Sequence, residues 1–183
     1  MTRVLTVSLL ASALLCGTVF ALMFRQTNVL ENQFQTAFVD CVVHEKLDGS
    51  GDYTSGLENA NSKTEIKVEN TSNIDAYIRL RFVTYWQDVN GNIVGKTSQM
   101  PEFTINGNWI KGSDNTYYYK KPVASGQFTD DLLASDIVLK MEEDKFIQVV
   151  EVFADAIQCQ PSRAAVNSWK VTIDGDGNIT KAP

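Results

Sequence analysis

Apolar and polar side chains alternate in the middle of the chain, and this alternation predicts β-strands. It is clearest over residues 77–86, where Ile78, Leu80, Phe82 and Trp86 share one face. The opposite face carries tyrosines, arginines and a valine. One apolar face and one mixed face are typical of a strand in an antiparallel sheet that covers a core from one side.

Turn signals divide the rest of the chain into further strands. Asn90-Gly91 predicts a hairpin after residues 77–86, because both residue types accept a positive φ. Two more hairpins are predicted over residues 109–119 and 171–180, the second with Asp-Gly-Asp-Gly at its turn. Residues 34–43 and 64–68 are predicted as two further extended segments.

Two segments near the C-terminus complete the predicted fold. Residues 146–157 have apolar positions at helical spacing, but their β-branched and aromatic side chains favour a strand, which we predict. Residues 161–169 begin with proline and contain two adjacent alanines, which predicts a short helix. The expected fold is mainly β, an antiparallel β-sandwich of jelly-roll or immunoglobulin-like type with one or two short helices.

The first residues follow a different pattern. Arg3 precedes an apolar run and small residues surround Ala21, which is the three-part pattern of a secretory signal peptide. The run is shorter than the ~20 residues that span a bilayer, which favours cleavage after Ala21 over an uncleaved anchor. We expect a signal helix at 1–21, an extended segment at 22–33 and a single β-sandwich domain at 34–183. Membrane contact then ends when signal peptidase cuts, and the protein is secreted.

The amino-acid composition limits the kinds of partner that the protein can bind. The formal net charge is −6, and the basic residues form no cluster, which argues against nucleic acid as a partner. Cys41 and Cys159 remain after the expected cleavage. Export permits a disulfide between them, and two separate buried thiols are the alternative that the sequence leaves open.

The sequence contains no recognisable catalytic motif. Its single histidine, His44, lies in a strand-like segment, and the patterns HExxH and Gly-x-Ser-x-Gly do not occur. Asp174 begins half of a calcium-loop pattern, but Ile179 stands where the loop needs glycine, so a tight turn is favoured. We therefore predict no catalytic, cofactor-binding or metal-binding residues, and a protein that is not an enzyme.

Two minor features of the sequence concern the surface. Trp109, Tyr117 and Tyr119 are candidates for a surface platform that binds glycan or peptide, although an ordinary role in the core and surface is the default for such a run of aromatic residues. Asn70-Thr-Ser72 and Asn178-Ile-Thr180 are glycosylation sequons, which matter only in a eukaryotic secretory path.

A resemblance to known proteins lies in residues 68–79, which read Val-Glu-Asn-Thr-Ser-Asn-Ile-Asp-Ala-Tyr-Ile-Arg. This segment resembles one in the TasA/camelysin-like proteins, which Gram-positive bacteria export with SipW-type signal peptides. Further similar segments follow in order at 86–92, 109–114, 117–119, 121–126 and 151–158, so that the resemblance covers nearly the whole chain. It is closest to uncharacterised members of that group.

The resemblance implies a jelly-roll-like β-sandwich at the cell surface or in the extracellular matrix. Some members polymerise into biofilm fibres, in which the N-terminal segment of one subunit completes a sheet of the next. The corresponding donor here lies within residues 22–43. The expected function is that of a secreted structural protein whose partners are copies of itself or other cell-surface proteins. A solitary extracellular module that binds glycan or peptide is the alternative.

Overall fold

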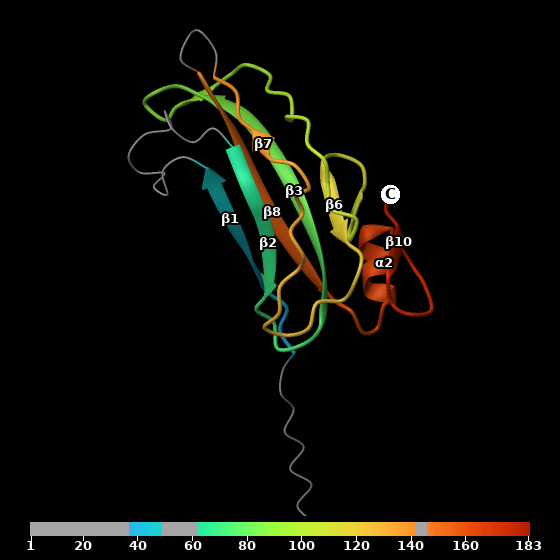
Figure 1. Ribbon diagram of the computed structural model, residues 1–183. Helices are drawn as coiled ribbons and strands as arrows, with labels where there is room; N and C mark the ends of the chain where they lie inside the picture. Colours follow the sequence, from blue (N-terminus) through green and yellow to red (C-terminus); the bar gives the residue numbers. More distant parts are fainter. Residues whose placement is uncertain (1–36, 49–61, 142–145) are drawn as a thin grey trace, which may run out of the picture. The chain divides into compact units, whose positions relative to one another are not determined.

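The computed structural model describes residues 37–48, 62–141 and 146–183, all within one compact unit that spans Ala37–Pro183 (Figure 1). These residues form mainly β-structure, with one α-helix among them. The elements in chain order are β1 (Cys41–Asp48), β2 (Ser62–Asn70), β3 (Ala76–Gln87), β4 (Ile93–Val94), β5 (Trp109–Lys111), β6 (Thr116–Tyr119), β7 (Ile137–Val138), β8 (Ile147–Gln158), α2 (Arg163–Trp169), β9 (Thr172–Ile173) and β10 (Ile179–Lys181).

The strands form antiparallel sheets. Three strands make one sheet in the order β1-β2-β7, and β9 pairs with β10 in a small hairpin. Five strands make the largest sheet, in which β3 pairs with β8 on one edge and with β4 and β6 on the other, and β5 continues the sheet beyond β6. The prediction of a mainly β, antiparallel fold is therefore confirmed.

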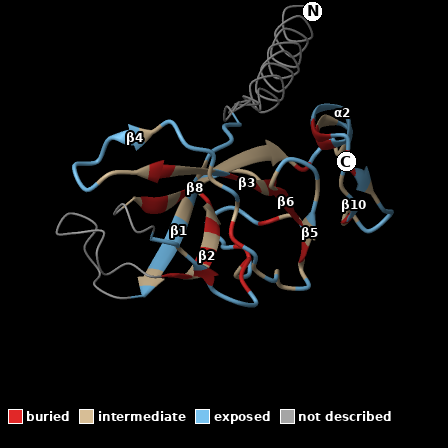
Figure 2. Ribbon diagram, turned by 90° about the horizontal axis from the view of Figure 1, so that it is seen from above, coloured by how far each residue is buried: buried red, intermediate tan, exposed pale blue. Residues whose placement is uncertain are grey.

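One hydrophobic core takes side chains from both larger sheets. In Figure 2 the buried positions gather along β2, β3 and β6, while β1 and β4 are largely exposed. Ile78, Leu80 and Phe82, every second residue in the middle of β3, face this core, as the alternation predicts. The members that lie on the longer strands are Ile66, Val68, Ile78, Leu80, Phe82 and Val150.

A second, smaller core lies on the other face of the five-stranded sheet. There α2 and the β9–β10 hairpin cover Tyr77 and Tyr118, with Trp169 and Ile179 among the covering side chains. The Tyr77 hydroxyl donates a hydrogen bond of 2.7 Å to the carbonyl oxygen of Gly177 in the hairpin turn. This cover explains why Tyr77 is buried although it belongs to the mixed face of β3.

Most predicted elements are found close to their expected positions. The ambiguous segment at 146–157 is strand β8, the predicted helix is α2, and the three predicted hairpins are β3–β4, β5–β6 and β9–β10. The predicted strand at 34–43 is wrong in its bounds, because β1 begins at Cys41 and continues to Asp48. The backbone N–H groups of Phe38 and Asp40 instead bond to side chains of the β2–β3 turn, Asn73 Oδ1 at 3.0 Å and Ser72 Oγ at 2.8 Å.

Candidate functional site

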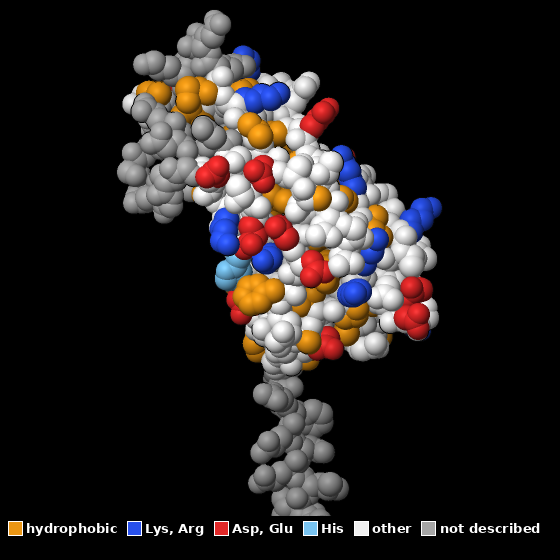
Figure 3. All heavy atoms as spheres, viewed as in Figure 1, with side chains coloured by type: hydrophobic (Ala, Val, Ile, Leu, Met, Phe, Trp, Pro, Cys, Tyr) orange, Lys and Arg blue, Asp and Glu red, His pale blue; other side chains and the backbone are white. Residues whose placement is uncertain are grey.

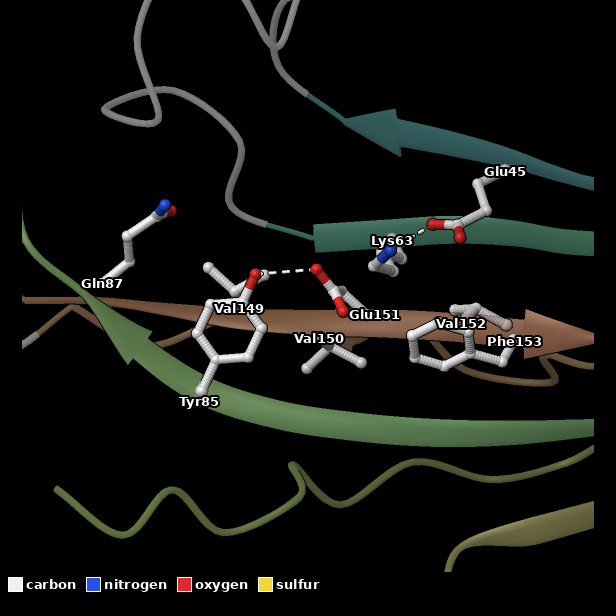
Figure 4. Close-up of a pocket in the computed structure, with 9 residues that line it drawn as sticks. All are labelled: Glu45, Lys63, Tyr85, Gln87, Val149, Val150, Glu151, Val152 and Phe153. Atoms are coloured by element: carbon white, nitrogen blue, oxygen red, sulfur yellow. Dashed lines mark hydrogen bonds and ion pairs between the residues drawn. The ribbon is translucent and has the colours of Figure 1, made fainter. Parts of the chain in front are cut away.

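A groove of about 630 Å³ runs along the first half of β8 (Figure 4). Residues 149–153 of β8 form its floor, Tyr85 and Gln87 of β3 lie on one side, and Glu45 of β1 and Lys63 of β2 lie on the other. The groove therefore lies where the margin of the five-stranded sheet faces the three-stranded sheet.

The backbone of β8 is unpaired along this groove. β8 bonds to β3 at all its positions, and the Gln148 N–H points the other way, donating 2.8 Å to the carbonyl oxygen of Lys140. Because backbone groups alternate along a strand, the N–H and C=O groups of residues 150, 152, 154 and 156 also point away from β3. Within the described part of the chain, no backbone group bonds to them there. β8 thus presents an open strand edge, which can accept another extended chain.

An ion pair faces inward at the groove. Glu45 lies on the same face of β1 as Cys41 and Val43, which pack against the main core. The β1–β2 register shifts between Lys46 and Leu47, and this bulge accompanies the burial of Lys63, which is 3% exposed. The Lys63 ammonium contacts the Glu45 carboxylate. Removing either partner would leave a poorly solvated charge, so the pair is a costly place for substitution.

A second carboxylate in the groove lacks a cationic partner among the described residues. The Tyr85 hydroxyl donates 2.8 Å to Glu151 Oε1, and Glu151 forms no ion pair with any other residue that the structure describes. Four positions along the same face, Asp155 accepts from both Arg79 and Arg81, at 2.9 and 3.1 Å. The groove therefore contains two carboxylates and one ammonium.

The predicted aromatic platform is wrong. Trp109, Tyr117 and Tyr119 are 3%, 2% and 7% exposed and belong to the main core. The Trp109 indole N–H donates to the carbonyl oxygen of Asp130, and the Tyr119 hydroxyl donates to the Asp130 carboxylate. Consecutive aromatic residues of β6 find cover on both faces of the sheet, which leaves none of these three side chains as a surface platform.

The two cysteines are free in this structure, as in the alternative of two separate thiols. Cys41 packs against the main core and Cys159 belongs to the second core. Burial raises the pKa of Cys41 to about 11, with smaller contributions from Asp40 and Asp155. Burial, followed by Asp75, also raises the pKa of Cys159. Both side chains are therefore neutral thiols near pH 7.

His44 lies on the solvent-facing side of β1. Its Nε2 is 3.0 Å from Glu69 Oε2, and its ring makes an edge contact with Phe128 at 5.1 Å between centroids. Figure 3 shows a face of the molecule on which acidic and basic side chains lie close to one another. In residues 37–48, 62–141 and 146–183, no group of three or more His, Cys, Asp or Glu side chains is placed to hold a metal ion.

The turn prediction for Asp174 is supported by its contacts. Asp174 Oδ1 accepts from the backbone N–H groups of Asp176 and Asn178, and Gly177 has a φ of 83°. Asp88 does the same for Asn90 and Asn92 in the β3–β4 turn. Each carboxylate caps its own turn in this way.

The remaining sequence predictions lie outside the described residues. These are the cleavage site at Ala21, the signal helix and the extended segment at 22–33. Within the described part, no helix is long and apolar enough to cross a membrane. The end of the expected donor segment, Cys41 to Val43, pairs with β2 of its own chain and is not available for donation.

Sequence reasoning missed the groove altogether. Glu45, Lys63, Tyr85 and Glu151 come from four strands and read as ordinary polar positions. Comparison of the chain with protein-family models, with curated proteins and with solved structures finds no match.

Proposed function

We propose that this chain is a secreted structural protein of the bacterial cell surface or extracellular matrix, and that its copies join by strand addition along β8. The main support for this proposal is the open edge of β8. An added strand satisfies backbone groups that bond to no described backbone group, and the groove supplies side-chain contacts on both faces. The resemblance to TasA/camelysin-like proteins points the same way.

The proposal includes a finer description of the fold. Two sheets that share one core support the jelly-roll-like sandwich that the resemblance implies. A sandwich has strand edges at its margins, and β1 and β8 supply two neighbouring ones here. Residues 22–33 are the proposed donor, since the chain downstream of them is tied to its own β2–β3 turn from Phe38 onward.

The geometry favours an open chain of subunits. β1 and β8 run in opposite directions, and the described chain begins at the start of β1, beside the end of β8 (Figure 1). The groove lies toward the opposite ends of these strands. A donor that leaves one end of a subunit and enters the other end of the next makes a head-to-tail contact, the kind that builds an open filament where the rotation between subunits does not close a ring.

A single proline tests the proposal. Val152→Pro removes an N–H that points away from β3, a position where an edge strand tolerates proline. Val152→Ala is the matched control, because it shortens the same side chain and keeps the N–H. For the chain that begins at Leu22, we expect Val152→Ala to assemble and Val152→Pro to remain monomeric by sedimentation and negative-stain microscopy, with both folded by circular dichroism.

Deleting residues 22–33 provides an independent test of the donor. Soluble, folded monomers are expected, because the described strands do not depend on these residues for their pairing. Filaments of unchanged yield from this deletion would rule out donation by residues 22–33. Equal assembly of Val152→Pro and Val152→Ala would rule out the β8 edge.

A solitary peptide-binding module is the second candidate, since the same groove suits any extended peptide. It predicts a protein that stays monomeric at high concentration while β8 still takes up a peptide. The glycan form of this alternative has no remaining support from Trp109, Tyr117 and Tyr119, which are buried.

A further inference from the structure

The most informative group in the groove is the carboxylate of Glu151. The other two charged groups there, Lys63 and Glu45, neutralise each other. Glu151 is exposed, bonds to a neutral tyrosine and has no cationic partner among the described residues. A strand added beside β8 would place one of its side chains next to Glu151, and a basic one would be favoured there.

The donor segment contains one basic residue. Between residues 22 and 33 the charged residues are Arg25 and Glu31. We propose, on the basis of the function above, that residues 22–27 of a neighbouring copy pair antiparallel with residues 149–154 of β8, with Arg25 opposite Glu151. The partner is thus a second copy of this chain, held in a single register.

The register places the other donor residues consistently. On the outer face Met23 lies opposite Phe153, a phenylalanine that is 45% exposed without the donor. On the inner face Phe24 lies opposite Val152, whose side chain packs against the main core. Apolar pairs of this kind stabilise neighbouring strands. The pairing ends with Leu22, the residue that follows the expected cleavage site.

Other registers are less favourable. A shift by two residues puts Met23 or Thr27 opposite Glu151 and leaves Arg25 beside Val149 or Phe153. A shift by one residue turns the Arg25 side chain toward the core, because successive side chains point to opposite faces. Beyond Val149 the edge is already occupied, since Gln148 bonds to Lys140.

The chain length favours a neighbouring copy over self-insertion. In this register residues 28–36 leave the groove at the end where β8 begins, whereas their own domain starts at the other end, near Cys41. Nine residues reach about 30 Å when fully extended. A return beside the eight residues of β1 takes about 25 Å, which leaves little slack for turning. Continuing straight into the preceding subunit needs no return.

A charge exchange tests the register in the chain that begins at Leu22. We expect Glu151→Arg or Arg25→Glu alone to raise the critical concentration for assembly about fivefold, because each places like charges opposite each other. The combined variant should return to within about twofold of the original value. Glu102→Arg, which makes the same change at an exposed site away from β8, is the matched control and should have no effect.

Each outcome of the exchange has a distinct meaning. A combined variant that assembles no better than the single variants overturns the register. If Val152→Pro still blocks assembly in that case, edge pairing survives and only the Arg25–Glu151 contact is lost. If Val152→Pro has no effect either, the proposed function fails as well. Coupling that appears in the melting temperature of a monomer indicates self-insertion and overturns the neighbouring copy as partner.

Discussion

Strands β3 and β8 are both 12 residues long and pair with each other at every position, but their other edges differ. β3 bonds on its far edge to β4 and β6, and Ala76 bonds to Val123 there. β8 has one such contact, at Gln148, and is otherwise open among the described residues. Two paired strands of equal length thus differ in whether their backbone groups are satisfied within the described part of the chain.

This difference between β3 and β8 distinguishes residues that stabilise the fold from residues that are available for assembly. A residue whose side chain and backbone are both enclosed contributes to folding alone. In β8, a residue such as Val152 has a side chain that packs against the main core, whereas its backbone N–H and C=O groups point to the open edge and can bond to a partner. Substitutions in the two strands should therefore affect different measurements.

The largest effect on stability is expected in β3, the strand that is paired on both edges. Leu80→Ala should lower the free energy of unfolding by about 3 kcal/mol, since Leu80 is fully buried between Tyr117 and Ala154 and its removal leaves a cavity. Phe153→Ala, on the open side of β8, should lower it by less than about 1 kcal/mol. Urea unfolding measures both. Equal losses would contradict the contrast between the strands.

A smaller effect is expected at the wall of the groove. Lys63→Met should cost about 2 kcal/mol, because it leaves Glu45 partly buried without its cation. Adding Glu45→Leu should recover most of that loss, as two apolar side chains can replace a buried pair. Thermal and urea unfolding of the single and double variants give the coupling. If the losses of unfolding free energy from the two single substitutions simply added up in the double variant, Lys63 and Glu45 would not act as a pair.

A still smaller effect is expected where β3 and β8 share charges. Asp155→Asn should cost about 1 kcal/mol, because Arg79 and Arg81 lose a common acceptor that is about a third exposed. Arg79 retains its contact with the Trp169 ring, at 4.8 Å. The loss should shrink at high salt, and Asp136→Asn on an exposed loop serves as the control. A loss independent of salt would point to packing as its cause.

The smallest effect near neutral pH concerns Cys41, which adjoins the open edge. Its raised pKa means that the folded state retains the proton more strongly than the unfolded state. The stronger binding of this proton by the folded state adds to the free energy of unfolding. That contribution is complete below pH 9 and is lost as the pH rises from 9.0, the ordinary pKa of the thiol, to about 11, its pKa in the folded state. At pH 8 a thiol reagent should label Cys41 about 100-fold more slowly than an unfolded cysteine. Labelling at the unfolded rate would show that Cys41 is not buried.

Sequence alone predicts the parts of this fold that depend on local pattern. Ile78, Leu80 and Phe82 mark the buried face of β3 by alternation, and Asn90-Gly91 marks its turn. The second half of β1 escapes prediction, because His44, Lys46 and Asp48 face solvent and leave no apolar period to detect. Here the pairing with β2 determines the strand, and no short pattern encodes it.

The candidate site depends on long-range information. Whether β8 is central or marginal follows from which strands pair beside it, and its apolar composition suits both positions. The inward position of Lys63 accompanies a register shift between β1 and β2, and no sequence pattern predicts this shift. The aromatic run at 117–119 is buried throughout, because a strand covered on both faces buries consecutive residues, and that cover comes from segments distant in the sequence.

The burial of Asn70 has a practical consequence for producing the protein. Its side-chain amide donates to Ile74 and Val123 at 2.9 and 2.8 Å and accepts from Ser72 at 3.0 Å, with no exposed surface left. A eukaryotic host could attach a sugar to this sequon only before the β2–β3 turn closes, and the sugar would then keep it from closing. Expression in bacterial cells avoids this conflict between glycosylation and folding.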